Sequence, residues 1–117
     1  MIKPASDFIS EAQAQIECLD VNAAKALYDE CGGNAVILDV REKHSADESK
    51  LANSINISRG LLEMQTHKHC PDVDAVIITH CGGGGRASLA ALTLKNMGYQ
   101  KVYAITAPFD DIKKVFG

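Results

Sequence analysis

Apolar residues along the chain gather in short segments that are separated by amphipathic ones. Residues 35–40 (AVILDV), 75–79 (AVIIT) and 101–106 (KVYAIT) are mainly apolar and rich in β-branched side chains. Such segments are typical of strands that are buried on both faces of a parallel sheet. Two shorter segments, 15–19 (QIECL) and 54–58 (SINIS), fit additional strands. The pattern therefore predicts about five strands.

Between the strands, apolar residues recur at the three- and four-residue spacing of helices that bury one face. Helices are expected over residues 6–16, 20–33, 60–67, 86–99 and 108–116. Ser6 and Asp20 are candidate N-terminal caps, and Gly32 and Gly33 provide a stop signal. Residues 41–53 form a polar segment to which no helix or strand is assigned. In the fourth helix, the side chains expected to face the sheet are Leu89, Leu92, Leu94 and Met97.

Strand and helix alternate through most of the chain. This order predicts an α/β fold, in which a mainly parallel central sheet of about five strands is flanked by helices on both faces. A length of 117 residues corresponds to one domain, residues 1–117, with residues 1–15 as an N-terminal helical extension. In such folds, ligands bind beyond the carboxyl ends of the strands. Cys81 and the segment 39–42 (DVRE) fall at such ends.

Charge and composition indicate which binding partners and which cellular compartment to expect. The net charge is −3 and no basic block is present, which argues against nucleic acid, because its binding rests on lysine and arginine. The first 15 residues lack the apolar core of a signal peptide, and no apolar run approaches the roughly 18 residues of a membrane span. A soluble, cytoplasmic protein without a membrane partner is expected. In that compartment the four cysteines are expected to be free thiols.

The segment CGGGGR carries the clearest chemistry. Cys81 ends a predicted strand, and the glycines lead into a predicted helix, whose unpaired N–H groups favour negative charge. The thiolate is the nucleophilic form of cysteine. A loop that curls around the sulfur forms an anion-binding nest, for which glycine permits the left-handed backbone. Arginine adds a charged fork that suits oxyanions. We therefore expect Cys81 to be the catalytic nucleophile and the substrate to be bound by Gly82, Gly83, Gly84, Gly85 and Arg86.

Other interpretations of these residues are weaker. A flexible glycine linker does not explain why the loop stands between a strand's carboxyl end and a helix. A Walker phosphate loop needs a lysine and a Ser/Thr where Arg86 and Ala87 stand. The histidines and cysteine of segment 67–70 lack the regular paired spacing of a zinc site, so no metal is expected. Asp39 and Arg41 either support the site or form a structural ion pair, and the structural interpretation is favoured for Asp39.

The segment CGGGGRAS, residues 81–88, resembles the cysteine loop of the rhodanese-like, or sulfurtransferase, family. In that family, four residues separate the cysteine from the arginine, and a small residue and a serine often follow. Residues 38–42 (LDVRE) resemble the strand-ending signature of the family, and residues 55–57 (INI) resemble part of another. The resemblance covers about residues 19–116. It implies a rhodanese-like fold, no metal or organic cofactor, and supporting roles for Asp39, Arg41 and Ser88.

The resemblance also implies a thiosulfate sulfurtransferase-like enzyme. In this interpretation Cys81 takes sulfane sulfur from thiosulfate or a persulfide, becomes a persulfide, and passes the sulfur to a thiol or cyanide. A protein persulfide carrier is a further candidate partner. Two alternatives stay open, a non-catalytic rhodanese-like module that binds a partner protein, and a cysteine-dependent phosphatase or arsenate reductase. Related phosphatases have one more residue between cysteine and arginine, so the spacing here favours sulfur. A loop without side chains predicts low efficiency with thiosulfate and broader use of persulfide donors.

Overall fold

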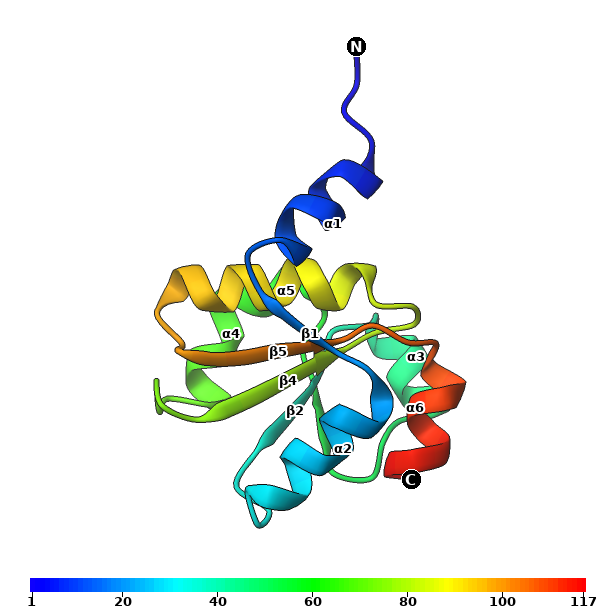
Figure 1. Ribbon diagram of the computed structural model, residues 1–117, viewed down its shortest axis with the longest axis vertical. Coiled ribbons are helices and arrows are strands. Elements are labelled where there is room, and N and C mark those ends of the chain that lie inside the picture. The colour runs from blue at the N-terminus through cyan, green and yellow to red at the C-terminus, as the bar shows by residue number, and fades with distance from the viewer.

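The computed structural model describes all residues, 1–117, and its centre is one sheet of five parallel strands (Figure 1). The order of the strands across the sheet is β1-β5-β4-β2-β3. The strands are β1 (Glu17–Leu19), β2 (Val36–Asp39), β3 (Ser54–Asn56), β4 (Val76–His80) and β5 (Lys101–Ile105). Because all pairs are parallel, the carboxyl ends of the strands meet at one edge, which we call the carboxyl edge.

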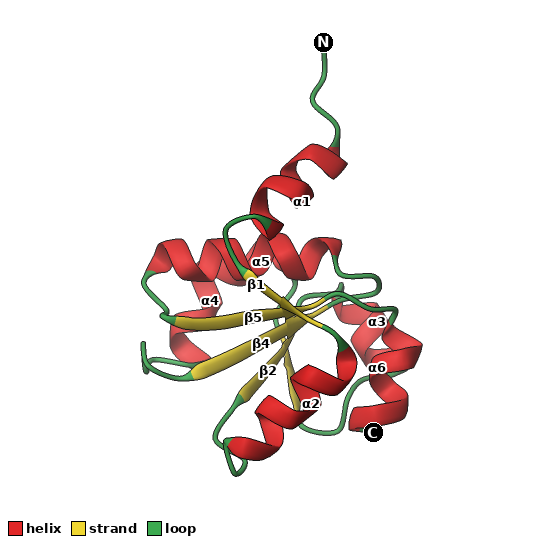
Figure 2. Ribbon diagram, in the orientation of Figure 1, coloured by secondary structure: helices red, strands yellow, loops and turns green.

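Helices cover both faces of this sheet (Figure 2). They are α1 (Ala5–Gln13), α2 (Val21–Glu30), α3 (Lys43–Glu48), α4 (Leu62–His69), α5 (Gly85–Met97) and α6 (Phe109–Phe116), and a short 3₁₀ helix η1 (Arg59–Leu61) precedes α4. One buried cluster joins the sheet to α4 and α5, and a second joins it to α2 and α6. Figure 1 shows α2 and α5 on opposite sides of the strands.

The central strands explain why their sequences are apolar throughout. Leu38 and Ile77 belong to the cluster on the α5 side, and their neighbours Ile37 and Ile78 belong to the cluster on the α2 side. Successive side chains of a strand point to opposite faces, so a strand with a helix layer on each face needs apolar residues at every position. The expected α/β fold with a parallel sheet of about five strands is confirmed.

One expected feature of the local structure is wrong, and one helix was not anticipated. Helix α1 begins at Ala5 with Pro4 as its cap, and Ser6 lies inside its first turn. Proline suits this position because the first N–H groups of a helix have no partner within the helix. The polar segment 41–53 contains the helix α3. Its single buried side chain, Ala46, leaves too weak an apolar pattern to predict a helix.

Helix α5 approaches the sheet mainly through small side chains, together with one of the expected leucines, Leu94. Among the four residues expected to face the sheet, only Leu94 is buried, and Met97 is 39% exposed. The remaining buried positions of α5 are Ala87, Ser88, Ala90 and Ala91. Small residues let the helix backbone lie close to the strands, which fixes the start of α5 near the end of β4.

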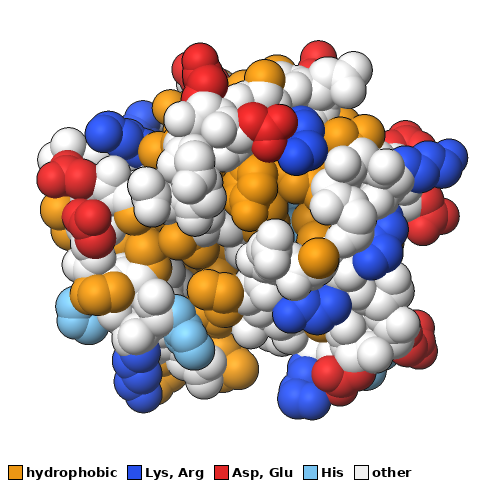
Figure 3. All heavy atoms as spheres, turned by 90° about the horizontal axis from the view of Figure 1, so that it is seen from below, with side chains coloured by type: hydrophobic (Ala, Val, Ile, Leu, Met, Phe, Trp, Pro, Cys, Tyr) orange, Lys and Arg blue, Asp and Glu red, His pale blue; other side chains and the backbone are white.

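The surface carries charges of both signs. Figure 3 shows acidic and basic side chains interspersed around a hollowed region in which hydrophobic side chains are visible. None of the helices combines the length and the apolar character that a bilayer crossing requires.

Candidate active site

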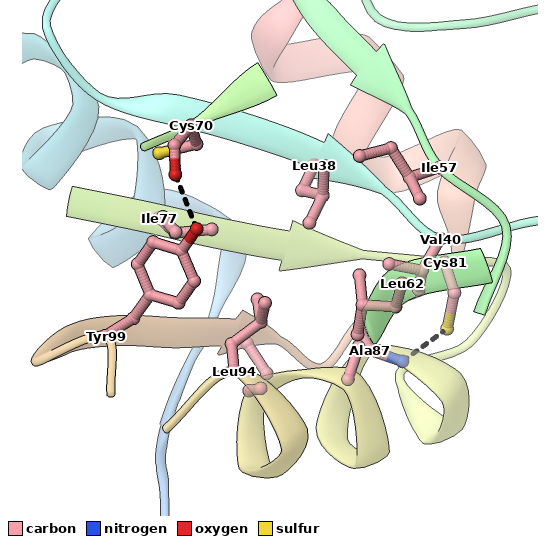
Figure 4. Packing of buried hydrophobic residues seen from close by; sticks show 13 residues of the cluster. Leu38, Val40, Ile57, Leu62, Cys70, Ile77, Cys81, Ala87, Leu94 and Tyr99 are labelled. Atoms are coloured by element: carbon pink, nitrogen blue, oxygen red, sulfur yellow. Dashed lines mark hydrogen bonds between the residues drawn. The ribbon is translucent and has the colours of Figure 1, made fainter. Parts of the chain in front are cut away.

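The candidate nucleophile lies between the central strand and the longest helix. Strand β4 ends at His80, Cys81 follows, and α5 begins at Gly85, so the cysteine stands at the carboxyl edge as expected. Its residue is only 1% exposed and packs in the same cluster as Val40 and Ala87 (Figure 4). The sulfur therefore lies beneath residues 82–85, which we call the glycine loop.

Two backbone amides point at the sulfur. The N–H of Gly84 donates to Cys81 Sγ at 3.0 Å, and the N–H of Ala87 donates to it at 3.4 Å. Hydrogen bonds from amides favour a sulfur that carries negative charge. The amides of Gly82, Gly83, Gly85 and Arg86 donate to no protein acceptor. These four amides are therefore available to donate to water or to a ligand.

Only one glycine of the loop uses a left-handed backbone. Gly84 has φ = 103°, whereas the other three have ordinary angles. A Cβ at Gly84 would also lie 2.9 Å from the Cα of Thr106, which follows β5. Gly84 is thus required both by its backbone angle and by close packing against a neighbouring chain segment. Within the glycine loop, the left-handed backbone that glycine was expected to permit is used at Gly84.

The other glycines differ in what surrounds them. A Cβ at Gly83 would meet nothing within 4 Å, and one at Gly82 would make an ordinary contact with Arg86 Nη2 at 3.5 Å. Both residues are exposed. A Cβ at Gly85 would lie 2.9 Å from Ile9 Cδ1, so the N-terminal helix closes this side of the loop. A molecule that approaches Gly82 and Gly83 from solvent therefore meets backbone and no side chain of the loop.

Arg86, the residue that follows the glycine loop, carries a positive charge and has an acidic neighbour. Its side chain is 43% exposed, and its Nη1 lies 3.9 Å from Glu42 Oε1. Both groups face water, so their mutual attraction is weak and is screened by salt. Glu42 nevertheless lowers the positive potential that an anionic ligand would meet at Arg86.

Asp39 and Arg41 form a buried ion pair beneath the carboxyl edge. Arg41 donates from Nε to Asp39 Oδ1 at 3.0 Å and from Nη2 to Asp39 Oδ2 at 2.8 Å, and Nη2 also reaches the carbonyl of Ser49 at 2.7 Å. The guanidinium carbon lies 3.9 Å from the ring centre of Phe109. Both side chains are turned inward, so this pair fixes the segment that leads to Glu42 and does not present a charge to solvent. This geometry fits the structural interpretation.

Ser88 connects the glycine loop to two helices. Its hydroxyl donates to the carbonyl of Gly84 at 2.7 Å and accepts from Nε2 of Gln13 at 3.1 Å. The residue is completely buried. Ser88 therefore fixes Gly84, the residue whose amide donates to Cys81 Sγ.

His80 lies on the opposite face of the sheet from Cys81, as the alternation along β4 predicts. Its ring stacks on Phe109, with centres 5.9 Å apart, and its register partner on β2 is Asp39. Neither ring nitrogen has a hydrogen-bond partner, and the residue is completely buried. Burial lowers the pKa of His80 below its usual value, while the charge of Asp39 opposes this shift and that of Arg41 adds to it. His80 is therefore held as the neutral imidazole.

Two of the other cysteines, Cys31 and Cys70, lie far from the candidate nucleophile along the strands. Cys70 precedes β4 and Cys31 follows α2, so both lie at the edge opposite to the carboxyl edge. Figure 4 shows Cys70 at the other end of the cluster from Cys81, where its carbonyl accepts from the hydroxyl of Tyr99. All four cysteines are free, and burial raises the pKa of Cys70. Neither thiol is placed to attack a sulfur bound at Cys81.

Sequence reasoning missed three contributors to this site. Glu42 was seen only as part of the DVRE segment, although its position at a strand's carboxyl end was a usable signal. Asn56 donates from Nδ2 to the carbonyls of Asp39 and Arg41, both at 3.0 Å, and so ties β3 to the end of β2. Gln13 comes from a helix far away in the sequence, and no local pattern could place it there.

Comparison with known proteins agrees with this geometry. Residues 21–114 match the sequence profile of the Rhodanese-like domain. The chain belongs to this family. A relative named thiosulfate sulfurtransferase GlpE, from Coxiella burnetii, is 27% identical to this rhodanese-like domain over 78 residues, which are 67% of this chain and 71% of the relative.

Two solved structures share the arrangement of this rhodanese-like domain. A protein of unknown function from Rhodopseudomonas palustris, described as a possible tyrosine phosphatase, superposes with a TM-score of 0.84 at 27% identity, over 100% of this chain and 94% of its own. A thiosulfate sulfurtransferase from Pseudomonas aeruginosa superposes with a TM-score of 0.77 at 24% identity, over 90% of this chain and 20% of its own. The second likeness shows the fold.

Substitutions in the glycine loop test which glycine the loop conformation requires. Gly84→Ala is expected to lower the free energy of unfolding by about 1–3 kcal/mol, because alanine is strained at positive φ and its Cβ meets Thr106. Gly83→Ala is the matched control, because its added Cβ would point into open space. It should change the free energy of unfolding by less than about 0.5 kcal/mol. Urea denaturation measures both. Equal effects of the two substitutions would contradict the conformation described for the loop.

The burial of His80 predicts how the stability of the protein depends on pH. Unfolding frees its ring to bind a proton with a pKa of about 6.5, which the folded state resists, so stability should fall as the pH drops below that value. Stability curves of His80→Phe between about pH 7 and 5 should be flatter, by at most about 1.4 kcal/mol per pH unit, the limit for one proton. His67→Gln, which alters an exposed histidine, is the control and should keep the parental slope. An unchanged slope in His80→Phe would show that His80 does not titrate on unfolding.

Proposed function

We propose that this rhodanese-like domain is a sulfurtransferase that moves sulfane sulfur from a donor to a thiophilic acceptor through a persulfide on Cys81. The observation that carries the proposal is that two backbone amides donate to Cys81 Sγ, while four further amides in the neighbouring segment 82–86 have no protein acceptor. These donors would hold a second sulfur that carries negative charge. The name of the GlpE relative supports thiosulfate as a donor class.

The reaction balances with the groups that the site provides. The Cys81 thiolate attacks the outer sulfur of thiosulfate, a new S–S bond forms, and the S–S bond of thiosulfate breaks as sulfite leaves with the electron pair. An acceptor thiolate or cyanide then attacks the terminal sulfur of the persulfide. The S–S bond to Cys81 breaks, and the cysteine leaves as a thiolate, which Gly84 and Ala87 stabilise through their amides.

The burial of Cys81 adds one requirement to this reaction. Since the residue is 1% exposed, the glycine loop has to shift before a donor can touch Sγ. Gly82 and Gly83 carry no side chains and face solvent, so such a shift displaces little packed material. The loop therefore serves as both the binding surface and the entrance.

The charges at the entrance favour some donors over others. Arg86 attracts an anionic donor, but Glu42 stands 3.9 Å from it and the loop supplies no second cation. A dianion such as thiosulfate therefore gains limited Coulombic attraction. We infer that persulfides of small thiols or of a carrier protein are accepted at least as readily as thiosulfate.

The alternative of a phosphatase receives support from the description of one structural neighbour. Against it stands the loop itself, in which four residues separate Cys81 from Arg86 and the sulfur is covered. A tetrahedral phosphoryl group needs a wider cradle than a single sulfur atom. The alternative of a non-catalytic binding module is disfavoured because the cysteine and its amide donors are present.

Intact-mass spectrometry tests the proposed reaction directly. Incubation with thiosulfate or with a small-molecule persulfide should add one sulfur, about 32 Da, and a thiol or cyanide should remove it again. The adduct should be absent in Cys81→Ser and present in Cys70→Ser, the matched control at the far edge of the sheet. No adduct with any sulfane donor, or rapid hydrolysis of an aryl phosphate by the parent but not by Cys81→Ser, would refute the proposal.

The acidic neighbour of Arg86 yields a second prediction. Glu42→Gln should raise kcat/KM for thiosulfate by about two- to fivefold at low salt, the range for an exposed ion pair, and the gain should shrink as salt is added. Glu48→Gln removes the same charge from the last residue of α3, which forms no ion pair with Arg86, and is expected to have a smaller effect. Steady-state kinetics measure both variants. A decrease in Glu42→Gln would mean that Glu42 orients Arg86 productively and does not weaken its attraction for the donor.

A further inference from the structure

The N-terminal helix packs directly against the helix that follows the glycine loop. Figure 1 shows α1 on the side of α5 that faces away from the sheet, and Ala12 is completely buried in this contact. Helix α1 lies outside the residues, 21–114, that match the family. We propose that α1 holds the glycine loop against Cys81, with Gln13 and Ile9 as positioning residues. The kinetic consequence of this proposal rests on the proposed function, whereas the structural part does not.

A chain of three hydrogen bonds leads from α1 to the sulfur. Nε2 of Gln13 donates to Ser88 Oγ at 3.1 Å, Ser88 Oγ donates to the carbonyl of Gly84 at 2.7 Å, and the amide of Gly84 donates to Cys81 Sγ at 3.0 Å. A hydroxyl has one proton to donate. Because Gln13 approaches as a donor, the proton of Ser88 is directed to Gly84. Gln13 therefore stabilises the orientation of the residue that holds the sulfur.

Ile9 supports the same segment by contact. Its Cδ1 lies 2.9 Å from the position that a Cβ of Gly85 would occupy, so the side chain packs on the backbone of the first residue of α5. Ile9 itself is partly buried. The helix thus touches Gly85 through an apolar side chain and reaches Gly84 through Ser88.

The loop has one further attachment, on the other side of the site. The amide of Phe109, at the start of α6, donates to the carbonyl of Gly82 at 3.1 Å. The first residue of the loop is thus held by α6, and its last two residues are held by α1. These attachments keep the amides of Gly84 and Ala87 directed at the sulfur of Cys81, which is 1% exposed.

Amide hydrogen exchange measures the attachment without reference to any reaction. In Gln13→Leu, which removes the donor and keeps the bulk, the amides of Gly84 and Ala87 should exchange about two- to tenfold faster, the range for the loss of one hydrogen bond. Gln13→Lys keeps a donor and should restore the protection. Gln13→Glu offers an acceptor that competes with Gly84 for the proton of Ser88. In this variant the amides of Gly84 and Ala87 should exchange at least as fast as in Gln13→Leu.

The same three substitutions at Gln15, which lies just beyond the end of α1, are the control for the change of charge and size. The side chain of Gln15 bonds only to the carbonyl of Glu11, so these variants should leave the exchange of Gly84 and Ala87 unchanged. Steady-state kinetics with a sulfur donor test the effect of Gln13 on the proposed reaction. Gln13 does not touch a donor bound at the loop, so Gln13→Leu should lower kcat about two- to tenfold with KM for the donor nearly constant.

The outcomes separate the two proposals. Unchanged exchange at Gly84 and Ala87 in Gln13→Leu would overturn the positioning role, and so would an increase spread evenly along α5, which indicates general loosening. Localised faster exchange, restored in Gln13→Lys, supports the role even if the parent transfers no sulfur, in which case the proposed function alone fails. If the parent transfers sulfur and Gln13→Leu does so with an unchanged kcat, α1 has no part in the reaction and the positioning proposal is wrong.

Discussion

The contact of two backbone amides with one buried sulfur is the interaction on which the rest of the site depends. Gly84 and Ala87 donate to Cys81 Sγ, and this geometry requires the chain to turn sharply between β4 and α5. The turn needs a residue at positive φ in a place where any Cβ would collide with Thr106, and Gly84 meets both requirements. A backbone cradle has no side chain that must be oriented, so its donors are fixed by the fold itself.

The fold supplies this cradle through its packing. Alanines along the buried face of α5 let the helix lie close to the sheet, so that its first amides reach the end of β4. The buried pair of Asp39 and Arg41 and the side chain of Asn56 fix the ends of β2 and β3 beside it. The carboxyl edge is therefore rigid around a loop that has few side chains of its own.

Much of this arrangement was predictable from the sequence, and the failures have physical causes. The strands, the parallel sheet and the position of Cys81 followed from local apolar patterns. The buried face of α5 was predicted only in part: Leu94 is buried as expected, but the other buried positions are small residues, because close approach to the sheet favours them over large side chains. The pair of Glu42 with Arg86 and the reach of Gln13 to Ser88 join residues distant in sequence. Such contacts depend on the finished packing and leave no periodic signal.

The central claim is that backbone amides hold the transferred sulfur, and a high-resolution crystal structure of the persulfidated protein tests it most directly. The account predicts that the terminal sulfur on Cys81 lies within hydrogen-bonding reach of the amides that are free in the present structure, those of Gly83, Gly85 and Arg86 among them. A terminal sulfur that points away from the loop, or that contacts only side chains, would contradict the account.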